Sequence, residues 1–259
     1  MARFGRRAAE APRLAPELDD VALGRMLRAL AGTPGAEPQG ILVAQAERLL
    51  REANDDWDRR GHRVTVLAGA APSLARRRRL KHPRSADALV LHAWADVLTA
   101  RLTGRLDDAA ATRDTCRRAA EAAPADPTPW VALLAALCLE GRTSAELTPV
   151  RKEIAARDPW NRETYLTIFV HLSPDGQGSQ AARREFLDDV VTVMPPQMPP
   201  ACLPLTAAVD HSHRELAGSG LSALVAARYW EQPQHTRLLD RTGPRSSGSG
   251  PGTRATRPA

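Results

Sequence analysis

The sequence predicts an all-α protein built as an α-solenoid, a stack of antiparallel helical hairpins. Residues 123–134 and 158–169 share a proline, a bulky residue and an apolar run at a separation of 35 residues. A fixed period of this size is typical of stacked helical hairpins. Only 4% of the 259 residues are aromatic, and the apolar residues are mainly Ala, Leu and Val, without the aromatic and Ile enrichment expected of strands. No window alternates apolar and polar residues over the length of a strand.

The net charge of +6 comes from the two ends of the chain. Residues 1–13 carry +3 and residues 241–259 carry +4, so residues 14–240 are nearly neutral. Basic ends of this kind attract phosphates or anionic lipid in a nonspecific, salt-sensitive way. We expect residues 1–16 to be a flexible basic N-terminus. Residues 241–259 are expected to be a disordered basic tail, because Gly, Ser, Pro and Arg cannot offset the entropy cost of ordering.

The cysteine pattern favours a reduced, cytoplasmic protein. The three cysteines are odd in number and widely spaced: Cys116, Cys138 and Cys202. Without a CxxC pair they predict neither a disulfide framework nor a zinc site, and buried structural thiols are the expected state. No apolar stretch near the start resembles a signal peptide. The longest apolar run, residues 131–139, is too short to span a membrane.

Residues 17–84 are expected to form an N-terminal helical region. Asp20 precedes an apolar stretch and places negative charge at a helix start. The Gly- and Pro-rich residues 32–40 predict a loop, and residues 41–53 predict an amphipathic helix.

A third helix is predicted within residues 54–68. Asn54 or Asp55 is the expected N-cap, and Trp57 is expected to lie in the core. Acidic residues precede basic ones by four positions, an order that stabilises a helix: Asp55–Arg59, Asp56–Arg60 and Asp58–His62.

Residues 85–194 are predicted to form three helical hairpins. Their helices are expected at 86–103 and from 109 to before Pro124, at 127–139 and 146–156, and at 160–172 and 180–194, with turns at Gly104, Gly141 and Gly176. Prolines then break the chain, and residues 195–240 are expected to hold further helices at 213–217 and 221–230.

The segment from about Asp87 to Met194 resembles degenerate tetratricopeptide repeats. Residues 104–109 look like the family's inter-helix turn, and Trp130 and Tyr165 each follow a proline by six residues, as the bulky repeat position does. Residues 56–68 are also similar to uncharacterised repeat proteins of high-GC bacteria. Arginine provides 34 of the 36 basic residues, a bias typical of such genomes.

The resemblance implies a groove lined by the first helix of each hairpin, which in this family binds a peptide or helix. The positions that correspond to the groove are mostly apolar: Thr128, Val131, Ala135, Cys138, Glu163, Leu166 and Val170. The lysine- and asparagine-rich clamp that some family members use for a partner's terminal carboxylate is absent. The expected ligand is therefore an apolar segment of a partner protein, or one of the chain's own helices.

Two basic clusters offer a different binding function. Arg59, His62 and Arg63 share a predicted helix face that suits an anion or an acidic partner, with a solvated helix surface as the alternative. The run of arginines at 76–79 could contact nucleic acid, although no aromatic residues for base stacking accompany it.

Metal and catalytic signatures are weak in this sequence. Residues 210–213 contain the only closely spaced His pair, but two residues apart on a helix they point in different directions, so a polar helix start is expected. The aspartates at 55–58 lack the glycine and glutamate of a calcium loop. No GxSxG, HExxH, P-loop or GxGxxG motif is present.

The sequence therefore predicts a non-enzymatic protein–protein interaction module with no cofactor or metal. Two alternatives stay open. One is a binder of nucleic acid or anionic surfaces that uses the basic ends and the arginine run. The other is an enzyme whose active-site groups converge only in the fold.

Overall fold

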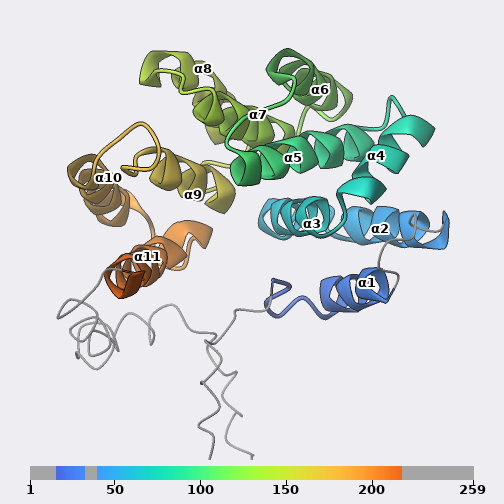
Figure 1. Cartoon of the computed structure of the whole chain (residues 1–259), viewed down its shortest axis with the longest axis horizontal. Coiled ribbons are helices and arrows are strands. Elements are labelled where there is room, and N and C mark those ends of the chain that lie inside the picture. The colour runs from blue at the N-terminus through green and yellow to red at the C-terminus, as the bar shows by residue number, and fades with distance from the viewer. Residues whose placement is uncertain (1–15, 33–39, 218–259) are drawn as a thin grey trace, which may run out of the picture. The chain divides into compact units, whose positions relative to one another are not determined.

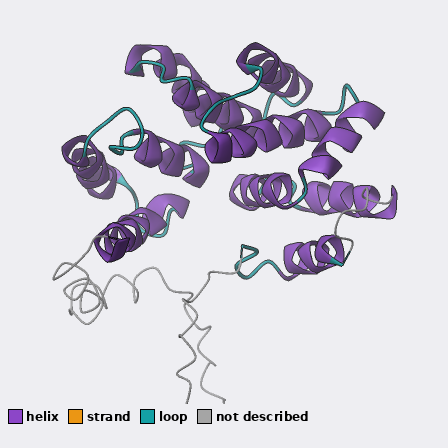
Figure 2. Cartoon of the chain, in the orientation of Figure 1, coloured by secondary structure: helices purple, strands orange, loops and turns teal. Residues whose placement is uncertain are grey.

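The computed structural model describes residues 16–32 and 40–217, and all secondary structure in that part of the chain is helical (Figures 1 and 2). The predicted all-α class is thus confirmed. The helices are α1 (Val21–Ala31), α2 (Gly40–Glu52), α3 (Trp57–Ala70), α4 (Pro72–Lys81), α5 (Ala86–Thr103), α6 (Ala109–Ala122), α7 (Thr128–Leu139), α8 (Ser144–Ala155), α9 (Arg162–His171), α10 (Gln180–Val193), the 3-10 helix η1 (Pro199–Cys202) and α11 (Leu203–Ala217).

Several predictions fall outside these residues. They are the flexible N-terminus before residue 16, most of the loop at 32–40, the helix at 221–230 and the basic tail at 241–259.

Helices α5 to α10 lie within a few residues of their predicted positions, because their ends carry local signals. Gly104 and Gly141 adopt φ of +84° and +70°, a left-handed conformation that glycine tolerates best, and both follow a helix as predicted. Thr143 and Glu146 form a capping box at the start of α8.

Three local predictions need correction. The N-cap of α3 is Asp56, which accepts a hydrogen bond from the Arg59 amide at 3.0 Å. Trp57 is only partly buried, because as the first residue of α3 it lines a surface depression against residues 123–126. Residues 210–213 lie inside α11, which begins ten residues before the predicted start.

The chain divides into two compact units, residues 1–186 and 187–259. The boundary falls inside α10. The sequence predicted separate segments at 17–84 and 85–194. The residues on both sides of that boundary belong to the first unit, because α3 packs against α5 and α7.

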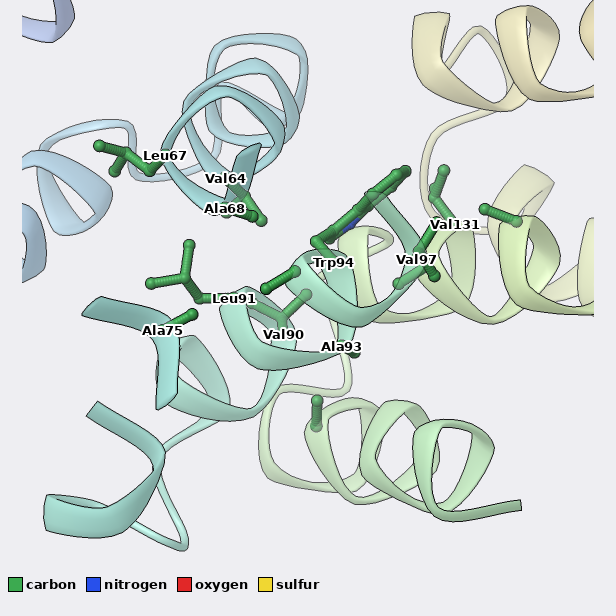
Figure 3. Packing of buried hydrophobic residues seen from close by; sticks show 14 of the residues in the cluster. Val64, Leu67, Ala68, Ala75, Val90, Leu91, Ala93, Trp94, Val97 and Val131 are labelled. Carbon is green, nitrogen blue, oxygen red and sulfur yellow. The ribbon is translucent and has the colours of Figure 1, made fainter. Parts of the chain in front are cut away.

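Helix α5 is the centre of the first unit, with α3, α4, α6 and α7 packed around it (Figure 1). Its Trp94 is fully buried, and Figure 3 shows this side chain near Val97 and near Val131 of α7. Val64 and Ala68 of α3 belong to the same apolar core. Because α5 is covered on nearly every side, apolar residues occur all around it rather than along one stripe.

A buried arginine on α3 connects three other parts of the unit. Arg60 is 7% exposed, and its guanidinium group donates to Asp126 at 2.8 Å, to Asp87 at 2.5 Å and to the Leu50 carbonyl at 3.4 Å. Burial opposes its charge, but Asp126 and Asp87 outweigh burial and raise the pKa of Arg60. Asp126 also accepts from the Thr128 amide at 2.8 Å, so the same carboxylate binds the first residue of α7.

One turn further along α3, Arg63 makes a second buried ion pair. Its Nε donates to Asp20 at 2.7 Å, and Nη1 donates to the Leu49 carbonyl at 2.5 Å. Asp20 in turn caps α1 through the amides of Ala22 and Leu23. Burial tends to raise the pKa of Asp20, but the hydrogen bonds from Arg63 and these amides outweigh it, and the pKa is lowered.

We predict that Arg60→Met destabilises the protein by about 3–5 kcal/mol, because it leaves two carboxylates without their buried cation. Arg59→Met is the matched control. Arg59 is exposed, and within the described part of the chain its ion pair is with Asp56, so its loss should change stability by no more than about 0.5 kcal/mol. Urea unfolding measures both variants. Equal stability of the two would contradict the structural role of Arg60.

Candidate functional site

A cluster of charged side chains lies where α9 meets α3, and we call it the α3–α9 junction. Arg162 of α9 forms an ion pair with Asp58 of α3, with 3.1 Å between Nε and Oδ1. A Cβ added to Gly61 would lie 3.8 Å from Cγ of Glu163, so α3 and α9 approach closely here. His62, one residue further along α3, completes the junction.

Burial dominates the electrostatics of this junction. It raises the pKa of Glu163 and of Asp58, and it lowers the pKa of His62. The positive charge of Arg162 acts in the opposite direction on both acids but does not outweigh burial. Among the described residues, the buried Nε2 of His62 has no hydrogen-bond partner, whereas the ring is bonded to the backbone of Pro16.

Arg101, near the end of α5, faces the junction from the side. Solvent reaches its side chain, yet burial lowers the pKa of its guanidinium group. Glu163 and the Cys138 thiol are titratable groups that act on this guanidinium group, which places Arg101 beside the junction. The guanidinium carbon lies 5.9 Å from the centre of the Trp94 ring, which fixes its orientation.

The structure separates the seven expected groove residues into two sets. Thr128, Val131 and Ala135 are only 1–2% exposed, because neighbouring helices, including α3, α5 and α6, pack against α7. These three side chains therefore belong to the core and line no open groove. The remaining four reach the surface: Cys138, Glu163 and Leu166 are partly buried, and Val170 is 58% exposed.

The expected basic face at Arg59, His62 and Arg63 does not form one surface. Arg63 is buried and bound to Asp20, whereas Arg59 is exposed and lies 3.5 Å from Asp56. The arginine run at 76–79 is divided in the same way. Arg78 is 2% exposed and pairs with Glu47 at 3.4 Å, so its charge serves packing rather than a shared surface.

The thiols are poorly suited to nucleophilic chemistry. Burial raises the pKa of both Cys116 and Cys138 to about 12, so neither is a thiolate at neutral pH. Cys202 is partly buried in the second unit. In residues 16–32 and 40–217 no group of His, Cys, Asp and Glu side chains is arranged to hold a metal ion.

Sequence reasoning missed one polar cavity, of about 400 Å³, between α4, α5 and α6. It contains His92, Asp96 and Thr112. The Thr112 hydroxyl lies 3.3 Å from Asp96 and donates to the Asp108 carbonyl at 3.0 Å. His92 approaches Asp96 only to 3.9 Å, and no contact joins His92 to the hydroxyl, so the pair lacks the geometry of a base and its nucleophile.

Comparison of the chain with protein-family models, with curated proteins and with solved structures finds no match to any of them. Within the described ranges, no helix has the length and apolar character needed to cross a membrane.

We predict that Glu163→Gln gains stability relative to the parent as pH rises above about 4.5, the ordinary pKa of glutamate. A carboxyl whose folded-state pKa is raised contributes stability at low pH and loses it as pH rises through the folded pKa. Glutamine has no such loss, and the other groups of the junction are common to both proteins.

Urea midpoints between about pH 4 and pH 8 test this expectation. Glu185→Gln, an exposed change on α10, serves as the control for the removal of one carboxyl group. A Glu163→Gln variant that loses stability at the upper end of this range would mean that the Arg101 and Arg162 charges outweigh burial.

Proposed function

We propose that this protein is a non-enzymatic protein–protein interaction module whose helical hairpins form a degenerate tetratricopeptide-like α-solenoid. Two features support the solenoid. Helices α6, α8 and α10 begin at residues 109, 144 and 180, close to a constant interval. Helices α3, α5, α7 and α9 each contact the next in this series, as the first helices of stacked hairpins do.

The proposed binding surface is the exposed face of α9 together with the ends of α5 and α7, and we call it the inner face. It consists of Arg101, Cys138, Glu163, Leu166 and Val170. The last three share one side of α9, because they lie three and seven residues apart. The single observation that carries the proposal is the 58% exposure of the apolar side chain of Val170, on the side of α9 that also carries Leu166 and Glu163.

This mixture of side chains suits a segment of a partner protein. Leu166 and Val170 offer apolar contact, and Arg101 and Glu163 provide one donor group and one acceptor group for the partner's polar atoms. The two charges favour one orientation of the segment over its reverse. The chain itself is nearly neutral between residues 14 and 240, which gives no comparable support to a nucleic-acid surface in this region.

We predict that Val170→Asp abolishes capture of the partner from extracts of the source cells, because the charge would be desolvated on binding. Leu166→Asp should weaken capture in the same way. Leu80→Asp is the control, since Leu80 is 82% exposed on α4 and lies outside the inner face. Val131 is unsuitable for this test because a charge there would enter the core. Far-UV circular dichroism checks that each variant keeps its helices.

A photo-crosslinking residue placed at position 170, and separately at position 80, identifies the occupant directly. Crosslinks to a second protein at 170 but not at 80 would support the proposal. Crosslinks confined to the chain's own segments, or unchanged capture by Val170→Asp, would refute it.

A further inference from the structure

A second cavity lies between α8 and α9, on the side of α9 opposite to the inner face. Its volume is about 330 Å³, near the lower end of the range for small-molecule sites. The lining residues come from α8, from the connection between α8 and α9, and from α9 itself, and they include Arg151, Lys152, Ala155, Asp158, Tyr165 and Ile168.

Aromatic stacking holds one wall of this cavity in place. The Tyr165 ring stacks on Trp160 with 5.7 Å between ring centres and on Phe186 with 6.3 Å. Its hydroxyl donates to the Pro159 carbonyl at 3.0 Å, so this polar group is already bonded. Tyr165 therefore contributes a fixed aromatic ring to the cavity wall rather than a free hydroxyl, which suits an apolar ligand body.

Two cations at the cavity have no acidic partner. Neither Arg151 nor Lys152 lies within ion-pair distance of a carboxylate in the described residues. By contrast, Arg157, two residues after the end of α8, forms an ion pair with Glu153 at 2.7 Å. Asp158, the acid in the cavity wall, accepts a hydrogen bond from Asn161 at 3.0 Å instead. The dipole of α8 favours basic residues near its C-terminus, but it does not supply a counter-ion.

We propose that this cavity binds a small amphiphilic carboxylate, with its apolar body against Tyr165, Ile168 and Ala155 and its carboxylate on Arg151 and Lys152. In this proposal the apolar walls contact the body of the ligand. Arg151 and Lys152, which form no ion pair within the described residues, bind its carboxylate. A carboxylate matches the two parallel donors of a guanidinium group. This ligand site is separate from the inner face, because Tyr165 and Ile168 lie on the other side of α9 from Leu166 and Val170.

Calorimetric titration of the full chain tests the site with three probes: hexanoate, 4-phenylbutyrate and indole-3-acetate. For the tightest of them, the matching neutral amide should bind at least tenfold more weakly, because a hydrogen bond between charged groups accounts for about one decade of affinity. The double variant Arg151→Gln/Lys152→Gln should lose affinity by a similar factor. Ala155→Phe, an exposed position in the cavity wall, should fill the space and remove binding without disturbing the core.

The control is Arg117→Gln/Arg184→Gln, which removes two exposed arginines that lie outside the cavity and should leave affinity unchanged. Val170→Asp should also bind the probe normally, so failure of the inner-face proposal would leave this one intact. Absence of saturable binding by all three acids overturns the proposal. So does equal binding of acid and amide, or full affinity in Ala155→Phe at an unchanged melting temperature.

Discussion

The first unit depends on the burial of one guanidinium group, that of Arg60. A charged group is tolerated inside a protein only when its hydrogen-bonding positions are occupied, and here the partners come from three places far apart in the sequence. Asp87 lies in the first turn of α5, Asp126 precedes α7, and the Leu50 carbonyl lies in the last turn of α2. Any displacement of one helix from α3 would leave a buried charge unpaired, so this group fixes how α2, α5 and α7 are placed around α3.

The same arrangement explains why a chain rich in arginine has a nearly neutral body. Arg63 and Arg78 are buried as Arg60 is, and their acids, Asp20 and Glu47, come from the preceding helices. Arginine suits this role because its planar group makes several hydrogen bonds while keeping its charge. Arginine abundance in this chain is therefore partly structural, and it is a poor indicator of a surface that binds nucleic acid.

Local signals predicted most of the helices, whereas long-range packing determined what the sequence missed. Gly104 and Gly141 lie where the backbone after a helix adopts a left-handed conformation, which glycine tolerates best. The turns between paired helices could therefore be located from the sequence alone. Helix α4 has no apolar stripe because four arginines follow one another, and which of them is buried depends on Glu47 in α2. The burial of Val131 likewise depends on α3 and α5 covering α7, contacts that no periodicity within α7 reveals.

Helix α9 shows how the presence or absence of an acidic partner separates structural arginines from available ones. At its N-terminus Arg162 is bound to Asp58, which ties the helix to α3, and Leu166 and Val170 reach the surface further along the helix. On its opposite side Arg151 and Lys152 of α8 line a mainly apolar cavity, and no carboxylate of the described residues lies within ion-pair distance of them. The sequence alone does not distinguish Arg162 from Arg151 and Lys152, because all three are basic residues. The fold distinguishes them by placing a carboxylate beside Arg162. A cation that the protein leaves unpaired beside an apolar wall retains its full affinity for an external anion, whereas a paired one must first give up its own acid.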